Sequence, residues 1–292
     1  MKFNIKDLIV YQFNDDSNIS NITNELLQDA AFIECGPTDS VKTGFISPFS
    51  NGDLLLTVKE HALITVQTES KILPAAVVNR ELAKKVKEVE EQTQQKVKKT
   101  QRLALKDELM MDLLPRAFTN ISQTYIWINY RDKFIGVATS SYKKAEDCLS
   151  VLRKLLGTLK ITPLATDNPV EHEFTNWIKE DKAPKYFTIL NTAVLVDPLD
   201  NGTIKAINED LTSSNLHSYI DDGRTVTLLT MSYKERTTFT INKNLILSNI
   251  KYSDELCEHV EYEDQDQVFE ATFLLIAEEL SELFKELMPN FK

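Results

Sequence analysis

The feature that most constrains the fold of this chain is the stretch between Pro74 and Pro115, which contains neither Gly nor an internal Pro. Mostly apolar residues recur along its first part with a helical period, and they are Leu82, Val86, Val89, Thr93 and Val97. A second helix should follow, with its inner face formed by Leu105, Leu109, Met110 and Leu113. Because these apolar stripes are narrow, a core cannot surround the helices on all sides. The pattern therefore predicts that residues 75–115 project from the body of the protein as a helical finger.

Positive charge is concentrated in the same part of an acidic chain. Residues 71–160 hold 18 of the 33 Lys and Arg but only 10 of the 44 Asp and Glu, although the formal net charge of the whole chain is −11. A polyanion responds to this local field and not to the sum of all charges. We find no helix-turn-helix spacing, zinc finger or aromatic RNA-binding motif that would read bases. The basic region therefore predicts contacts to the nucleic-acid backbone without sequence preference.

The residues that we predict to contact DNA all belong to this basic region. They are Arg80, Lys84, Lys85, Lys87, Lys96, Lys98, Lys99, Arg102, Arg116, Lys143, Lys144 and Arg153. The alternative for the lysines of residues 80–102 is an ordinary charged helix surface, although Glu81, Glu88, Glu90 and Glu91 offset only part of their charge.

Composition bounds the class of protein. A chain of 292 residues with 42% hydrophobic content holds one large domain or two to three small ones, with a substantial core. Cys35, Cys148 and Cys257 form no CxxC pair, which indicates a reducing compartment with buried thiols. Because neither a signal peptide nor an apolar run of about 20 residues is visible, we expect a cytoplasmic protein without a membrane partner.

The remaining periodicity predicts an α+β fold with antiparallel sheets. Strands are expected at residues 3–13, 54–58, 62–68, 123–130, 133–139, 186–196, 202–207, 225–233, 237–241 and 245–252. Helices are expected at residues 20–31, 143–157, 170–179 and 210–220, with a last helix that carries Phe269, Phe273, Ile276, Leu280, Leu283 and Leu287 inward. A turn-rich stretch should contain Pro37, Gly44, Pro48 and Gly52. We predict a central α+β domain (1–74 with 116–165), the finger (75–115) and a second α+β domain (166–292) with the C-terminal helix.

Signatures of catalysis are absent from the sequence. It contains no phosphate-binding GxxxxGK[ST] loop, no GxGxxG, no GxSxG and no HExxH. Two acidic groups are candidate metal ligands, and they are Glu171-His172-Glu173 and the set Glu261, Glu263, Asp264 and Asp266. Acidic residues before or in the first turn of a helix are, however, typical of solvated helix starts. We therefore predict no catalytic residues, no metal and no cofactor. A metal-dependent nuclease that uses the late carboxylates is the alternative.

Several segments, in the same order and with the same spacing, resemble the RdgC family of recombination-associated proteins. They are Lys71-Ile72-Leu73-Pro74, Leu105-Lys106-Asp107-Glu108, Leu113-Leu114-Pro115-Arg116-Ala117-Phe118, Gln123-Thr124, Trp127-Ile128, Lys143-Lys144-Ala145-Glu146-Asp147, Leu152-Arg153-Lys154, Leu156-Gly157 and Thr162-Pro163-Leu164. Cys35-Gly36 and Asp210-Leu211-Thr212 are shorter matches. The sequence departs from the family pattern at Ile207-Asn208-Glu209, where family members carry basic or amide residues, so no role is transferred to these positions.

The resemblance implies a nucleoid-associated protein without enzymatic activity that forms a ring-shaped homodimer. Such a ring has a positively charged hole, binds double- and single-stranded DNA, and restrains the RecA recombinase. A protein that blocks the recombinase by direct contact, without DNA, is a further alternative.

Phe118 matches a family residue at the end of the finger. It is interpreted either as a dimer or gate contact, or as a core residue that packs at the hinge.

Overall fold

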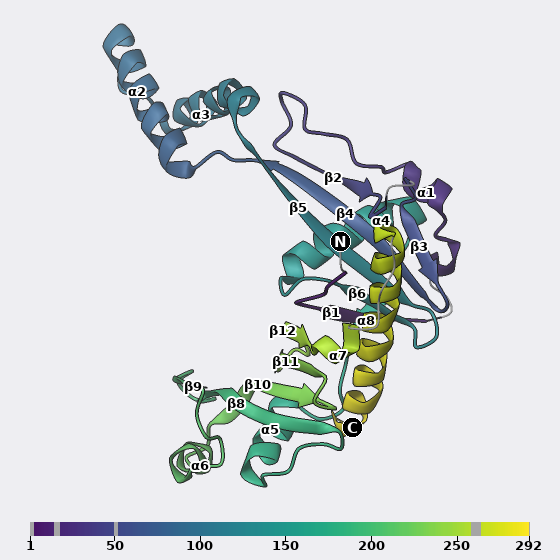
Figure 1. The fold of residues 1–292 in the computed structure, drawn as a ribbon. Coiled ribbons are helices and arrows are strands. Elements are labelled where there is room, and N and C mark those ends of the chain that lie inside the picture. The colour runs from purple at the N-terminus through teal and green to yellow at the C-terminus, as the bar shows by residue number, and fades with distance from the viewer. Residues whose placement is uncertain (1–2, 15–17, 50–51, 258–263, 292) are drawn as a thin grey trace.

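The computed structural model describes residues 3–14, 18–49, 52–257 and 264–291. It is an α+β fold of two antiparallel sheets, as the sequence predicted (Figure 1). The strands are β1 Ile9–Phe13, β2 Val41–Ile46, β3 Leu55–Val58, β4 His61–Lys71, β5 Thr119–Asn129, β6 Phe134–Val137, β7 Ile161–Pro163, β8 Phe187–Val196, β9 Thr203–Ile207, β10 Thr225–Tyr233, β11 Thr237–Asn242 and β12 Leu247–Tyr252.

Eight α-helices occur among the described residues. They are α1 Asn24–Gln28, α2 Ala75–Thr93, α3 Lys99–Leu113, α4 Tyr142–Leu156, α5 Val170–Lys179, α6 Ser214–Asp221, α7 Asp254–Cys257 and α8 Gln265–Leu287. Short 3-10 turns lie at Asn18–Asn21, Leu114–Arg116 and Met288–Phe291.

The first sheet has seven strands in the order β2-β4-β5-β6-β1-β7, and β3 pairs with the same edge of β4 as β2 does. Its longest ladder joins β4 and β5, from His61 opposite Asn129 to Lys71 opposite Thr119. Alternate residues of these strands point to opposite faces. Ile64 and Ile126 pack with Leu149 of α4, whereas Leu63 and Trp127 belong to the cluster that contains α8. Helices α4 and α8 therefore cover opposite faces of the first sheet.

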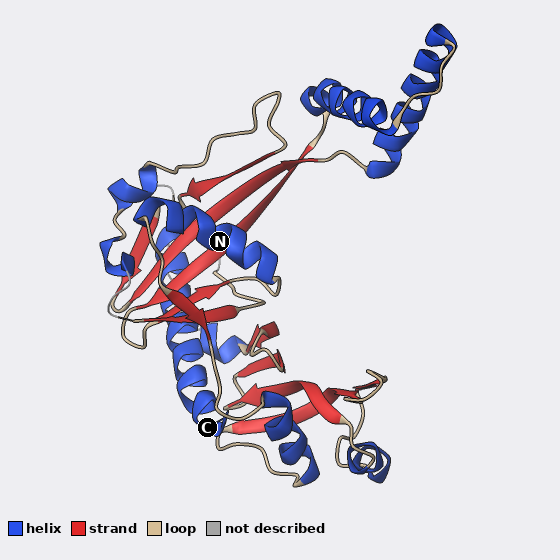
Figure 2. Cartoon of the chain, turned by 180° about the vertical axis from the view of Figure 1, so that it is seen from behind, coloured by secondary structure: helices blue, strands red, loops and turns tan. Residues whose placement is uncertain are grey.

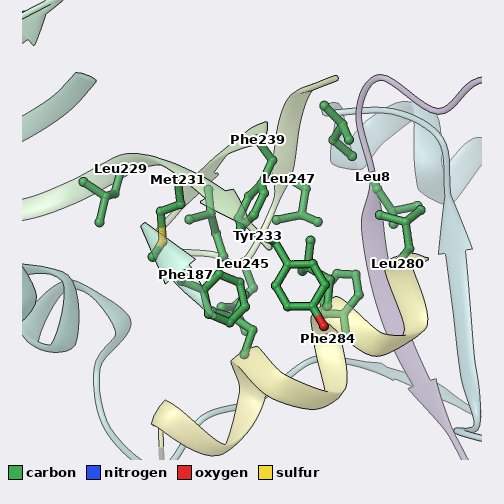
Figure 3. Packing of buried hydrophobic residues seen from close by; sticks show 14 of the residues in the cluster. Leu8, Phe187, Leu229, Met231, Tyr233, Phe239, Leu245, Leu247, Leu280 and Phe284 are labelled. Carbon is green, nitrogen blue, oxygen red and sulfur yellow. The ribbon is translucent and has the colours of Figure 1, made fainter. Parts of the chain in front are cut away.

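The second sheet has five strands in the order β12-β11-β10-β8-β9. Figure 3 shows how it packs on the C-terminal half of α8, where Phe284 lies beside Tyr233 and Leu280 belongs to the same cluster. Leu8, from the segment before β1, joins this cluster and exchanges backbone hydrogen bonds with Leu247 of β12 at 2.8 and 3.0 Å. One continuous apolar cluster thus connects both sheets through α8.

The long amphipathic helices and the meanders were predicted well. The helix predicted at residues 143–157 forms as α4, which buries Ala145, Cys148, Leu149 and Leu152 and ends at Gly157, with φ of +73°. Every residue predicted on the inner face of the last helix is buried in α8. The strands predicted at residues 54–58, 62–68, 123–130 and 133–139 also form, as the antiparallel pairs β3–β4 and β5–β6.

Of the residues predicted to mark a turn-rich stretch, Pro37 lies in a turn, whereas the prediction for Gly44 was wrong, because this glycine lies inside β2. A Cβ atom on Gly44 would come 2.5 Å from the Cα atom of Phe32. The segment of residues 30–32 runs alongside β2 there as a parallel bridge, in which Phe45 N donates to Ala30 O at 2.9 Å and Phe32 N donates to Phe45 O at 2.8 Å. Gly44 is needed for this close approach of two backbones and not for a turn.

Four predicted element boundaries also require correction. The first strand begins at Ile9 and not at residue 3, because residues 6–8 bond to the β12 region of the other sheet. The helix predicted at 20–31 is a 3-10 turn followed by α1, which Thr23 caps. Helix α2 ends at Thr93, so Val97 lies in the connection to α3. Helix α6 begins at Ser214, because Asp210 forms a turn by accepting bonds from both Thr212 N and Oγ1.

Candidate nucleic-acid interface

The α2–α3 pair is carried by the far end of the β4–β5 ladder. Figures 1 and 2 show both helices lying beyond the end of the sheet, connected to it by the two strands. The ladder extends one residue past β4, because Ile72 N donates to Phe118 O at 2.7 Å. A two-stranded ribbon therefore presents the helices to solvent.

A small apolar cluster holds α2 against α3. Its buried members are Val78 and Leu82 of α2 and Leu109 of α3, with partly buried Leu73, Val86, Leu105, Met110 and Leu113 around them. This cluster is separate from the two large ones of the sheets. The inner residues predicted for the second helix are confirmed, whereas the predicted stripe of the first helix leaves the interface before Thr93, which is exposed and donates its hydroxyl to Val89 O at 2.7 Å.

Lys85 stabilises the contact between the two helices. Its Nζ lies 3.1 Å from Glu108 Oε1 and 3.9 Å from Asp112 Oδ2, both on α3. The connection is bonded as well, since Val97 N donates to Glu90 Oε1 at 2.9 Å. Of the predicted DNA contacts, Lys85 is therefore the one whose charge is already used inside the helical pair.

Three other predicted cations of α2 have carboxylate neighbours on their own helix. Glu81 Oε1 lies 3.2 Å from Arg80 Nε and 3.0 Å from Lys84 Nζ, and the hydrogen bond from Lys84 lowers the pKa of Glu81. Lys87 Nζ lies 3.7 Å from Glu91 Oε1. Exposed pairs of this kind are weak and exchange readily, so these cations remain accessible, although their field is partly cancelled.

The second group of cations lies at the connection and at the start of α3. Lys96, Lys98, Lys99 and Arg102 are all exposed, and no carboxylate of the described residues forms an ion pair with them. The first turn of α3 contains no acidic residue. Cations at a helix N-terminus face the positive end of the helix dipole, which costs stability. Helix stability therefore does not explain this arrangement, whereas an external polyanion would.

The remaining predicted contacts lie nearer the sheet. Arg116 is exposed in the 3-10 turn that follows α3. Lys143, Lys144 and Arg153 belong to α4, where Arg153 Nη2 lies 3.7 Å from Glu146 Oε2. The structure thus places the twelve residues in two groups, one on the α2–α3 pair with its flanking turn and one on α4. Sequence reasoning missed the cross-helix role of Lys85, because Glu108 and Asp112 lie more than twenty positions away.

Phe118 is 85% exposed, so its interpretation as a buried hinge residue is wrong. Ile72 and Ile121, its neighbours on the ribbon, and Met111 on α3 are also exposed. Single exposed apolar residues are ordinary, but several at one end of a molecule are typical of a contact surface. We refer to Ile72, Met111, Phe118 and Ile121 as the ribbon-end apolar residues.

The residues considered for catalysis have structural roles where they are described. Within residues 3–14, 18–49, 52–257 and 264–291, no three His, Cys, Asp or Glu side chains come together as a metal site. Glu171 and Glu173 occupy the first turn of α5, and Asp264 caps α8 by accepting from Asp266 N at 2.9 Å. Glu261 and Glu263 lie outside the described residues.

Cys148 is buried against the sheet, which raises its pKa, whereas Cys35 is only partly buried. No described helix is long and apolar enough to cross a membrane.

Comparison with known proteins gives a consistent result over the whole chain. Residues 3–292 match the family described as "Putative exonuclease, RdgC". The recombination-associated protein RdgC of Yersinia enterocolitica is 37% identical over 290 residues, which cover 97% of this chain and 96% of that protein. The proteins of the same name from Yersinia pestis and Yersinia pseudotuberculosis are 36% identical over the same shares. With sequence similarity that runs through both sheets, the α2–α3 pair and α8, this chain belongs to the RdgC family of recombination-associated proteins.

Proposed function

We propose that this protein binds DNA without sequence preference as a ring-shaped homodimer, and that it thereby restrains RecA-dependent recombination in the nucleoid. The observation that carries the proposal is the row of exposed cations from Lys96 to Arg102, which lacks carboxylate partners among the described residues. Its members point into solvent from a helical pair that is held away from the acidic body of the chain. Backbone phosphates of DNA are the polyanion that suits such a surface.

The shape of the chain supports a ring. Figure 1 shows an open arch, with the α2–α3 pair at one end, the second sheet at the other, and α8 along its outer side. Two copies related by a two-fold axis, with both ends in contact, would close around a central hole. In this proposal the central domain (1–74 with 116–165) forms the wall, the finger (75–115) forms one contact and the domain of residues 166–292 forms the other.

Both ends of the arch carry surfaces that suit contact with a second copy. The ribbon-end apolar residues lie at one end. At the other end, β9 is the edge of the second sheet and pairs only with β8 among the described strands. Ile207, its last residue, is 59% exposed, and Leu199 in the preceding turn is 93% exposed. Exposed edge strands readily pair with another chain.

An exonuclease is the second candidate, because the family description names that activity. It requires groups that activate water, and two of the four late carboxylates, Glu261 and Glu263, lie outside the described residues. A protein that contacts the recombinase directly, without DNA, is the third candidate. The three candidates differ in whether they require DNA, a metal ion or contact with the recombinase, so one set of measurements distinguishes them.

The test combines DNA affinity with the mass of the protein. Binding to an arbitrary duplex should weaken steeply with salt, survive a chelator and leave the DNA intact, while light scattering at micromolar concentration gives the mass of a dimer. Chelator-sensitive loss of DNA length would support the nuclease. Co-sedimentation with recombinase in the absence of DNA would support direct contact. A monomeric mass would overturn the ring.

A further inference from the structure

A pocket of about 650 Å³ lies between α4 and the β2–β4–β5 part of the first sheet. Its volume is within the range of small-ligand sites. Hydroxyl groups of Thr43, Thr68 and Ser122 come from three adjacent strands and line the sheet side. The Thr43 and Thr68 hydroxyl oxygens lie 3.1 Å apart. Three neighbouring strands therefore present hydroxyl groups to one recess.

Helix α4 forms the opposite wall with one stripe of side chains. Lys144, Asp147, Val151 and Lys154 recur at helical spacing and all line the pocket. At 1.5 Å per residue, the two lysines are about 15 Å apart along the helix axis. A third lysine, Lys42, lines the pocket from β2, with its Nζ 3.4 Å from Asp39 Oδ2.

The lining of this pocket combines positive charge with apolar surface. Two lysines of α4, Lys144 and Lys154, stand beside one lining carboxylate, Asp147, so the recess favours an anion, whereas the side chain of Lys42 alternates to the other face of β2 and pairs with Asp39. Ala30, Val41, Val151 and Leu155 add apolar walls between the charged groups. Hydroxyl and ammonium donors suit a phosphate, and apolar side chains suit a sugar or the face of an unpaired base. The combination matches a nucleotide unit better than a simple inorganic anion.

We propose that this pocket binds a short segment of single-stranded DNA, with successive phosphates toward Lys144 and Lys154 and a sugar against Val41 and Val151. The inference rests on the proposed DNA-binding function and assigns a distinct site to one form of DNA. A single strand bends easily and exposes its sugars and bases, whereas duplex DNA is stiff, with a persistence length of about 150 base pairs, and keeps its bases stacked inside. The recess between helix and sheet therefore selects the single strand.

The test compares two variants that remove the same charge. Lys144→Gln/Lys154→Gln removes two lysines of the pocket, and Lys59→Gln/Lys160→Gln removes two exposed lysines that neither line the pocket nor belong to the predicted DNA contacts. Binding of a labelled oligo-dT to the full chain is followed by fluorescence anisotropy across salt concentrations. The pocket variant should bind about tenfold more weakly or worse. Its log–log salt slope should flatten by about 0.7 per lost phosphate contact. The control variant should change much less, and binding of duplex DNA should weaken less than binding of oligo-dT.

Two further measurements locate the effect. Asp147→Asn should tighten binding of oligo-dT, because it removes the carboxylate that opposes the phosphate. Amide NMR signals of Thr43, Thr68 and Ser122 should shift during the oligo-dT titration. Should the lysine variant fail to fold, Thr43→Val/Thr68→Val keeps the shape of the pocket and removes two donors, and it should also weaken oligo-dT binding.

Equal weakening by the pocket and control variants, with duplex binding intact, would overturn the pocket while the proposed DNA-binding function stands. Amide shifts confined to another face would do the same. Loss of all DNA binding by the unaltered protein would instead overturn the proposed function itself.

Discussion

Arg236 Nη2 donates to Glu279 Oε2 at 2.7 Å, and the Glu279 side chain is only 3% exposed. Thr237 Oγ1 donates to the other carboxylate oxygen at 2.9 Å. The adjacent residue on α8, Glu278, accepts from Arg131 Nη2 at 3.1 Å, beside the first sheet. Two consecutive acidic residues of α8 thus form ion pairs with the two sheet regions, so α8 holds the sheets together by ion pairs as well as by apolar packing.

The buried carboxylate predicts a large loss of stability when its partner is removed. Arg236→Gln should lower the free energy of unfolding by about 3 kcal/mol, the lower end for a buried pair because Arg236 is itself partly exposed. Lys234→Gln, which removes the more exposed bond to Glu282 at 2.8 Å, should cost less than about 1 kcal/mol. Urea unfolding measures both. Equal effects of the two substitutions would contradict the importance of burial.

His61 predicts a dependence of stability on pH. Trp127 Nε1 donates to His61 Nδ1 at 3.3 Å, and His61 Nε2 lies 3.5 Å from Glu278 Oε1, with Arg131 and Asp132 also nearby. Burial lowers the pKa of this histidine in spite of Glu278. Because the folded pKa lies below the unfolded value of about 6.5, the stabilisation by neutral His61 is present above that pH and is lost as the pH falls through the folded pKa.

The free energy of unfolding should therefore fall more steeply below pH 6.5 in the unaltered protein than in His61→Gln. The difference in slope should not exceed about 1.4 kcal/mol per pH unit, the value for one proton. Urea unfolding between pH 7.5 and 5 gives the two slopes. The control is His172→Gln on the exposed side of α5. Parallel curves for the unaltered protein and His61→Gln would show that His61 does not contribute.

Phe118→Ala should leave the subunit folded. Because the phenyl group of Phe118 is exposed in the single chain, the substitution should change the free energy of unfolding by less than about 0.5 kcal/mol. The buried control Phe45→Ala should cost about 3–5 kcal/mol. If Phe118 contacts a second copy, sedimentation should show faster or more complete dissociation of the dimer, with altered DNA affinity or preference for free ends. A large loss of subunit stability with unchanged assembly would contradict this role.

The cations of the α2–α3 pair should differ in their effect on duplex binding. Charge reversal of Lys96, Lys98 and Lys99 should weaken binding to all sequences alike and flatten the log–log salt slope by about 0.9 per lost contact. Reversal of Lys84 and Lys87 should weaken it less for each residue, because Glu81 and Glu91 already offset their charge. Lys85→Glu should instead destabilise the helical pair. Fluorescence anisotropy with two unrelated duplexes and circular dichroism distinguish these outcomes.

Local periodicity predicted those helices and strands that pack through a single face, because the residues of that face recur at a fixed spacing in the sequence. The stripe of α4 and the inner face of α8 are visible in sequence because each helix packs on a single sheet surface or one continuous cluster. Strand β10 was predicted with its observed bounds, Thr225–Tyr233, because its residues are strongly β-favouring and flanked by turns.

The errors arose where a distant segment determines local structure. Gly44 indicates a turn in sequence, but its role depends on the backbone of Phe32, which lies close against β2. Residues 3–13 were predicted as one strand, yet residues 6–8 bond to the β12 region, some 240 positions away. The basic zone was visible in sequence, whereas the partition of its lysines into paired and unpaired groups required the positions of Glu81, Glu108 and Asp112. The hydroxyl-lined pocket beside α4 was not predicted, because Thr43, Thr68 and Ser122 meet only in the folded sheet.

Encirclement of DNA is tested most directly by topology. The protein is loaded at low salt onto a covalently closed circular plasmid and onto the same plasmid cut once, and both are washed at high salt, which removes contacts made only by charge. A ring should stay on the closed circle and leave the linear DNA over its ends, and later cutting of the circle should release it. Equal release from both forms would contradict the ring and leave a protein that binds one side of DNA.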